Sequence, residues 1–115
     1  MSTLKNTLIQ ITQEGMGNGD NELGLLLLKN YLSLLSEENE RPRVIAFYNA
    51  GVKLLANGSP LVRQFKDLEN AGIRLVACKT CLKHYNLLDQ IEVGIQGTMI
   101  DIMELQKVAN KVVNL

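Results

Sequence analysis

The sequence is poor in several residue types, and each shortage excludes a class of protein. Among 115 residues there is no tryptophan, one histidine, two cysteines and two prolines, and aromatic residues make up only 4%. Twelve Lys and Arg residues balance twelve Asp and Glu residues, so the formal net charge is zero. Proteins that bind nucleic acids or anionic membranes usually carry an excess of positive charge. We therefore expect neither kind of partner.

Long apolar runs are also missing. Runs such as Leu25–Leu28 fall far short of the roughly 18 residues that a membrane-spanning helix needs. The first residues lack the basic region and long apolar stretch of an export signal. Cys78 and Cys81 lie too close in sequence to close a useful structural disulfide loop, and a reducing compartment would keep them as thiols. We expect a cytosolic chain that folds as one domain over residues 1–115.

Apolar, β-branched segments alternate along the chain with segments rich in helix formers. Such alternation is typical of a parallel sheet with helices on both faces, because parallel neighbours need crossover connections. The sequence therefore predicts an α/β fold, a single three-layer α/β/α domain with a five-stranded, mostly parallel sheet. Strands are expected at residues 6–12, 43–48, 73–77, 93–95 and 111–115, and helices at residues 21–36, 51–55, 60–71, 80–85 and 98–110.

Ligands of such sheets bind beyond the carboxyl ends of the strands, where three segments should meet. The first is the glycine-rich loop 13–20, which resembles a phosphate-binding turn only by position. It has Asp20 where the dinucleotide fingerprint requires glycine, and this carboxylate would repel a phosphate. We interpret Gly17, Gly19 and Asp20 as a flexible rim of the site. No motif for a cofactor is present, and we expect none to bind.

The second segment follows the second expected strand and contains Asn49 and Gly51. Asn49 could cap the following helix or hydrogen-bond a bound group, and capping is the interpretation that we favour. The third segment begins where the third expected strand ends, and it carries Cys78, Thr80 and Cys81. We expect this third segment to supply the chemistry of the site.

The cysteine pair is the most informative feature of the sequence. A thiol reacts as its thiolate, and a place in the first turn of a helix lowers the pKa of a thiol. Lys79, Lys83 and His84 add positive charge, so we expect the thiolate form of Cys78 or Cys81 to be favoured. His84 could also act as a base, but a surface histidine without a catalytic role could occupy the same position in the sequence. The alternative is that both cysteines are merely small buried apolar residues.

Three chemistries use two thiols at this spacing. One thiolate can accept a sulfur atom as a persulfide and hand it on, or the pair can cycle between dithiol and disulfide. The third chemistry is metal binding by Cys78, Cys81 and His84, but the chain offers no other Cys or His as a fourth ligand. We therefore expect no metal site.

The segment 21–36 is apolar almost all round, with a narrow polar stripe through Lys29, Ser33 and Ser36. One sheet cannot cover that much of a helix surface, and in a small domain the second cover is often another subunit. The last helix repeats the pattern more weakly. We therefore expect a homo-oligomer.

Five segments in this order resemble the DsrE/DsrF-like family of small sulfur-relay proteins, most of all its YedF-like group, which is linked to selenium metabolism. They are residues 19–24, 49–54, 58–60, 78–82 and 93–94. The resemblance implies a DsrE-like domain that forms trimers or hexamers and exchanges sulfur with donor and acceptor proteins. It also implies that a cysteine after the third strand, corresponding best to Cys78, carries the persulfide. The most similar members have Cys81 too, with glycine in place of Lys79.

The leading hypothesis is thus a possible sulfurtransferase, a thiol protein that accepts sulfur on Cys78 or Cys81 and passes it to a partner. Two alternatives stay open. The chain could be a non-catalytic oligomeric binding module whose thiols are incidental, or a thiol-disulfide redox protein that uses the cysteine pair.

Overall fold

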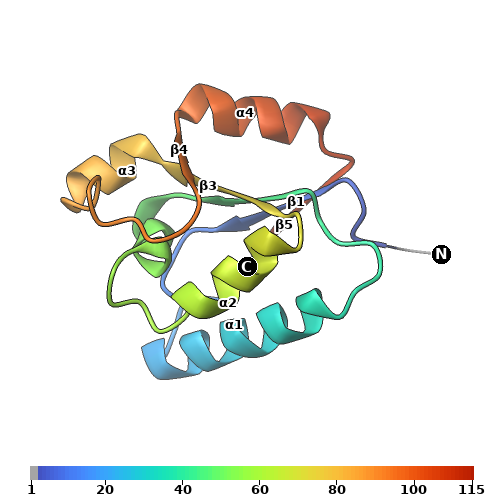
Figure 1. Cartoon of the computed structure of the whole chain (residues 1–115), viewed down its shortest axis with the longest axis horizontal. Coiled ribbons are helices and arrows are strands. Elements are labelled where there is room, and N and C mark those ends of the chain that lie inside the picture. The colour runs from blue at the N-terminus through green and yellow to red at the C-terminus, as the bar shows by residue number, and fades with distance from the viewer. Residues whose placement is uncertain (1–2) are drawn as a thin grey trace.

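The computed structural model describes residues 3–115 and contains a five-stranded parallel sheet between helices (Figure 1). The strand order is β4-β3-β2-β1-β5, and all four pairings are parallel. The α/β prediction with a five-stranded sheet is therefore confirmed. The strands are β1 (Thr7–Ile11), β2 (Val44–Phe47), β3 (Arg74–Cys78), β4 (Ile95–Gly97) and β5 (Lys111–Asn114).

Helices cover both faces of the sheet. Helices α1 (Asn21–Ser36) and α2 (Val62–Asn70) lie on one face, and α4 (Met99–Val108) lies on the other (Figure 1). The 3-10 helix η1 (Asn49–Leu55) follows β2, and the short helix α3 (Lys79–His84) follows β3. These two short helices pack against each other, so the segments that follow two neighbouring strands are held together.

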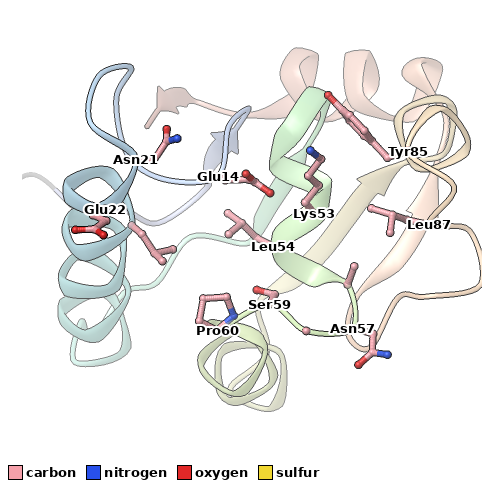
Figure 2. A pocket seen from close by; sticks show the side chains of 13 residues that line it. Glu14, Asn21, Glu22, Lys53, Leu54, Asn57, Ser59, Pro60, Tyr85 and Leu87 are labelled. Atoms are coloured by element: carbon pink, nitrogen blue, oxygen red, sulfur yellow. The ribbon is translucent and has the colours of Figure 1, made fainter.

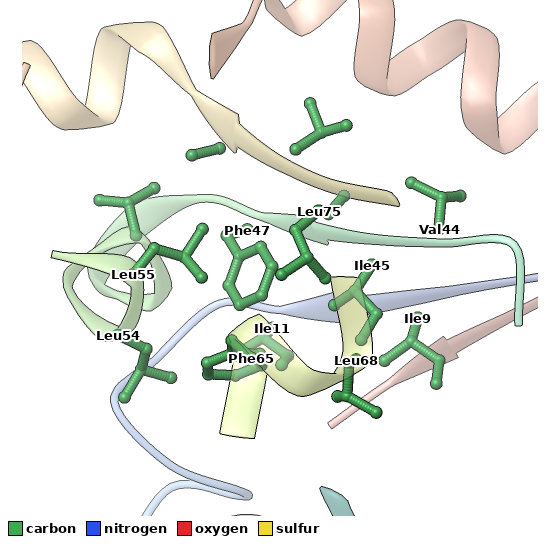
Figure 3. Close-up of a cluster of buried hydrophobic side chains, with 14 of the residues drawn as sticks. Ile9, Ile11, Val44, Ile45, Phe47, Leu54, Leu55, Phe65, Leu68 and Leu75 are labelled. Carbon is green, nitrogen blue, oxygen red and sulfur yellow. The ribbon is translucent and has the colours of Figure 1, made fainter. Parts of the chain in front are cut away.

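The core lies mainly between the sheet and α2. Ile45 and Phe47 of β2 face Phe65 and Leu68 of α2, and the rings of Phe47 and Phe65 meet edge to face with centroids 5.1 Å apart (Figure 3). All residues of β1 and β2 are buried, because helices cover both sides of these strands. The central strands therefore give the carboxyl edge of the sheet a rigid base.

Under α4 the sheet carries a buried polar group. Gln10 of β1 is 4% exposed, and its side-chain oxygen accepts a hydrogen bond from the Gln106 amide at 2.7 Å. The Gln10 amide in turn donates to the side-chain oxygen of Asn114 on β5. Satisfying both ends of this amide avoids the free-energy cost of a buried unpaired polar group. These two hydrogen bonds tie α4 and β5 to β1.

Several element boundaries differ from the sequence prediction by a few residues. The Ser59 hydroxyl accepts a hydrogen bond from the Leu61 amide at 3.2 Å, which closes a turn before α2 and delays the helix to Val62. Strand β4 begins at Ile95 instead of residue 93, because Gly94 has a φ of +86° that a strand cannot contain. A capping box between Thr98 and Asp101 starts α4, and this helix ends at Val108, two residues earlier than expected.

Helix α1 is only half covered by the rest of the domain. Leu28, Leu32 and Leu35 are buried against the core, whereas Leu26 and Leu34 are 54% and 66% exposed. The inference that one sheet cannot cover this helix is therefore correct. Within residues 3–115, no helix combines the length and the apolar character needed to cross a membrane.

Candidate functional site

The two cysteines have different environments. Cys78 is the last residue of β3, points into the core and is 1% exposed. Cys81 lies in α3 and is half-buried, so its sulfur is the more accessible of the two. The expectation that Cys78 stands open at the edge of the sheet is wrong, because η1 and α3 close over the end of β3.

The sulfur of Cys81 receives a hydrogen bond from the backbone of a distant segment. The Asn49 amide N–H donates to Cys81 Sγ with an N–S distance of 3.0 Å. Asn49 has a φ of +53°, in the left-handed region that asparagine tolerates better than most residues. Its side chain does not cap η1. The structure therefore does not show the capping role that we favoured for Asn49, and its contact with Cys81 is made by the backbone.

Two residues with no recognisable signal in the sequence complete this arrangement. The Tyr85 hydroxyl donates a hydrogen bond to Asn49 Oδ1 at 3.3 Å. The Lys53 ammonium lies 4.3 Å from the centroid of the Tyr85 ring, a cation–π contact. Contacts therefore run from Lys53 through Tyr85 and Asn49 to Cys81.

The pKa of the Cys81 thiol is raised, whereas the sequence led us to expect a lowered pKa. Burial raises the pKa of the Cys81 thiol most strongly, the hydrogen bond from the Asn49 backbone lowers it, and interaction with the Cys78 thiol raises it further. The net pKa is above that of an ordinary thiol. Helix α3 is only six residues long, and Lys79, Lys83 and His84 are exposed to solvent, which screens their charge.

The raised pKa of Cys81 predicts how its reactivity depends on pH. The thiolate is the reacting form, so alkylation by iodoacetamide should be slow at neutral pH and should accelerate up to a midpoint above that of a free cysteine. Stopped alkylation followed by mass spectrometry would give the rate for each cysteine. Cys78 should react at least about tenfold more slowly, because it is buried. A Cys81 midpoint below neutrality would contradict the environment described above.

The glycine-rich loop leads from the end of β1 to the start of α1, at the same end of the sheet as α3 (Figure 1). The carboxylate of Asp20 accepts a hydrogen bond from the Leu23 amide at 2.8 Å and so caps α1. Gly17, with a φ of +80°, and Gly19 are exposed in the turn that leads to this cap. Asp20 therefore has a structural role as a helix cap, and a role of Gly17, Gly19 and Asp20 as a rim of the thiol site stays a prediction.

The remaining candidates differ in what they contact. Gly51 is buried in η1, and a Cβ at this position would lie 2.1 Å from the carbonyl oxygen of Ile11, so it serves packing. Thr80 is exposed in the first turn of α3. His84 is exposed, and its ring packs edge to face against Tyr85 with centroids 5.0 Å apart. Residues 3–115 contain no group of three or more His, Cys, Asp and Glu side chains arranged to hold a metal ion.

A cavity of about 600 Å³ opens beside this arrangement (Figure 2). Its walls come from the loop after β1, the start of α1, η1 with the turn that follows it, and the segment after α3. Tyr85 and Lys53 belong both to these walls and to the contacts that lead to Cys81. The carboxyl edge of the sheet thus carries the half-buried thiol of Cys81 and, beside the residues that contact this thiol, the cavity.

Comparison with known proteins identifies the fold. The profile of the DsrE/DsrF-like family matches residues 7–115. No curated protein matches the chain significantly.

Three solved structures superpose on nearly the whole chain. MTH1491 from Methanobacterium thermoautotrophicum, a protein of unknown function, has a TM-score of 0.70 and 19% identity, and the match covers 95% of this chain and 97% of that one. The ychN protein from E. coli has a TM-score of 0.72 and 18% identity, with 96% and 99% covered. BT1422 from Bacteroides thetaiotaomicron, also of unknown function, has a TM-score of 0.69 and 20% identity, with 96% and 95% covered. These likenesses show a shared fold.

Proposed function

Because the chain belongs to the DsrE/DsrF-like family, which is linked to sulfur relay, we propose that it accepts sulfur on Cys81 as a persulfide and passes it to a partner protein. The observation that carries this proposal is the peptide N–H of Asn49, which lies 3.0 Å from Cys81 Sγ at the carboxyl edge of the sheet. Cys78 is too buried to meet a donor without movement of η1 or α3. We therefore assign the sulfur to Cys81, although the family resemblance favoured Cys78.

The transfer needs a donor persulfide and no added oxidant. The Cys81 thiolate attacks the outer sulfur of the donor, the donor S–S bond breaks, and the donor leaves as a thiolate. An acceptor thiolate then attacks the outer sulfur on Cys81, takes that sulfur as its own persulfide and restores the Cys81 thiolate. The Asn49 N–H donates to Cys81 Sγ, the sulfur that attacks as a thiolate in the first step and on which negative charge develops in the second, when Cys81 is the leaving group. A raised pKa reduces the amount of thiolate but makes the thiolate that forms a stronger nucleophile.

Cys78 supports a second candidate function. Its thiol is close enough to Cys81 to raise the pKa of that residue, so the pair could also form a disulfide. Attack of Cys78 on the inner sulfur of a Cys81 persulfide would give this disulfide and release hydrosulfide. A protein that worked only by this cycle would be a thiol-disulfide redox protein. In either role we infer a reducing compartment, the cytoplasm, because both cysteines are free thiols.

The test is to map sulfur onto the protein. The reduced chain is incubated with a low-molecular-weight persulfide, and its cysteine peptide is analysed by mass spectrometry. We expect the mass of one additional sulfur atom, located on Cys81. A Cys78–Cys81 disulfide without added sulfur would favour the redox function instead. Unchanged thiols that also resist alkylation would contradict both functions and favour a non-catalytic binding module.

We also propose that the chain forms a homo-oligomer through the outer face of α1, as a trimer or hexamer by resemblance to the family. Leucines on this face form an apolar strip that would be exposed to water in a monomer. The strip consists of Leu23, Leu26, Leu27 and Leu34, which are 41% to 66% exposed.

If this face of α1 is the subunit interface, negative charge placed on it should dissociate the oligomer. Light scattering coupled to size exclusion should give a mass several times that of the 12.8 kDa chain, and Leu26→Glu combined with Leu34→Glu should shift it to the monomer. Lys29→Glu changes the charge of an exposed position on the same helix and should leave the mass unchanged. A wild-type monomer at tens of micromolar would overturn the proposal.

A further inference from the structure

The cavity beside Tyr85 has the size and lining of a small-molecule site. Its volume of about 600 Å³ lies in the range of roughly 300 to 1,000 Å³ that is usual for ligand pockets. Leu25, Leu54 and Leu87 give it apolar walls, and Figure 2 shows the last two of them. Because these walls come from segments that follow three different strands, the cavity lies where parallel sheets bind their ligands.

Charged groups of both signs line this cavity without pairing with each other. Lys53 contributes an ammonium group and Glu14 a carboxylate, and Glu22 adds a second carboxylate at the start of α1. Within residues 3–115, the ion pairs with a nitrogen–oxygen distance of 4.0 Å or less join Arg63 to Asp67 and Lys107 to Glu104. Neither Lys53 nor Glu14 therefore forms an ion pair of this kind. A ligand that carries both a carboxylate and an ammonium group could pair with both side chains. The extra carboxylate disfavours a ligand with net negative charge.

The cavity also lies next to the sulfur. Lys53 and Asn49 belong to the same short helix, η1, so one element contacts both the cavity and Cys81. Tyr85 lines the cavity and reaches Asn49 through its hydroxyl at 3.3 Å, a long and therefore weak hydrogen bond. The contacts from the cavity to the half-buried thiol thus pass through Tyr85 and Asn49.

From this geometry we infer that the cavity binds a zwitterionic thiol, either cysteine or a small peptide of cysteine with free amino and carboxyl groups. The carboxylate of the ligand pairs with Lys53, its ammonium group pairs with Glu14, and its aliphatic part packs on Leu54. The inference rests on the proposed function, because it names the donor. The persulfide of this ligand gives its outer sulfur to Cys81, the donor S–S bond breaks, and the ligand leaves as its thiolate once Tyr85 has moved aside.

S-Methylcysteine tests the binding step alone, because it keeps both charges and cannot exchange sulfur. Titration followed by amide NMR should give saturable shifts centred on η1 and Tyr85. Lys53→Met and Glu14→Gln should each weaken binding roughly fivefold, the size of one partly exposed ion pair. Lys66→Met removes an exposed lysine of α2 outside the cavity and should change nothing. N-Acetyl-S-methylcysteine, which lacks the ammonium group, should bind more weakly than the parent compound.

Binding and sulfur transfer can fail separately. S-Methylcysteine should bind the Cys81→Ser variant as well as the wild type, because the cavity walls do not include this residue. A wild-type protein that binds S-methylcysteine but takes up no sulfur from the persulfide would overturn the proposed function and leave the cavity site standing. Shifts that do not saturate, or that are the same in the Lys53→Met and Glu14→Gln variants, would overturn the cavity site even if Cys81 accepts sulfur.

Discussion

Cys81→Ser should abolish persulfide formation, whereas Cys78→Ala should retain it. The serine hydroxyl is not ionised near neutral pH and cannot accept sulfur, so the yield should fall by about two orders of magnitude or more. Cys78 cannot substitute, because it is 1% exposed at the end of β3. Persulfide content after exposure to a low-molecular-weight persulfide, mapped by peptide mass spectrometry, measures both variants.

Cys78→Ala should also make loading of Cys81 faster near neutral pH. Interaction with Cys78 raises the pKa of Cys81, so removal of that thiol increases the fraction of thiolate at neutral pH. Alanine is the suitable replacement because it fits a buried site and introduces no unpaired hydroxyl. If Cys78→Ala lost the persulfide and Cys81→Ser kept it, the assignment of sulfur to Cys81 would be wrong.

Gly51→Ala should destabilise the domain by about 3 kcal/mol or more and lower Tm by roughly 10 °C. The added methyl group would lie 2.1 Å from the Ile11 carbonyl oxygen, far inside van der Waals contact. That oxygen cannot easily move, because it accepts the Tyr48 amide N–H at 3.2 Å between the two central strands. The helix η1 would have to shift instead, and with it Asn49 and its contact to Cys81.

Thermal unfolding by circular dichroism measures this effect, and the chain offers a matched control. Gly19 has no heavy atom within 4 Å of an added Cβ and no positive φ. Gly19→Ala should therefore change the free energy of unfolding by less than about 0.5 kcal/mol. Equal stability of the Gly51→Ala variant and the wild type would show that η1 does not pack against the end of β1 as described.

The amino-acid sequence by itself determined the layers and the approximate elements of the domain. The strand segments are almost wholly apolar, which indicates a sheet buried on both faces, and helix-forming segments separate them. The same reasoning placed the cysteine pair where β3 ends and found the surplus of leucine on α1. These features depend on local composition and periodicity, which any single sequence displays.

The tertiary structure decided what the cysteine pair can do. The packing of η1 against α3 buries Cys78, leaves Cys81 half-exposed and brings the Asn49 amide to its sulfur across 32 positions of sequence. The same burial raises the pKa of Cys81, whereas charge counting along the chain had suggested the opposite. Accessibility, desolvation and hydrogen bonds between distant segments depend on which surfaces meet in space, and spacing along the chain does not specify that.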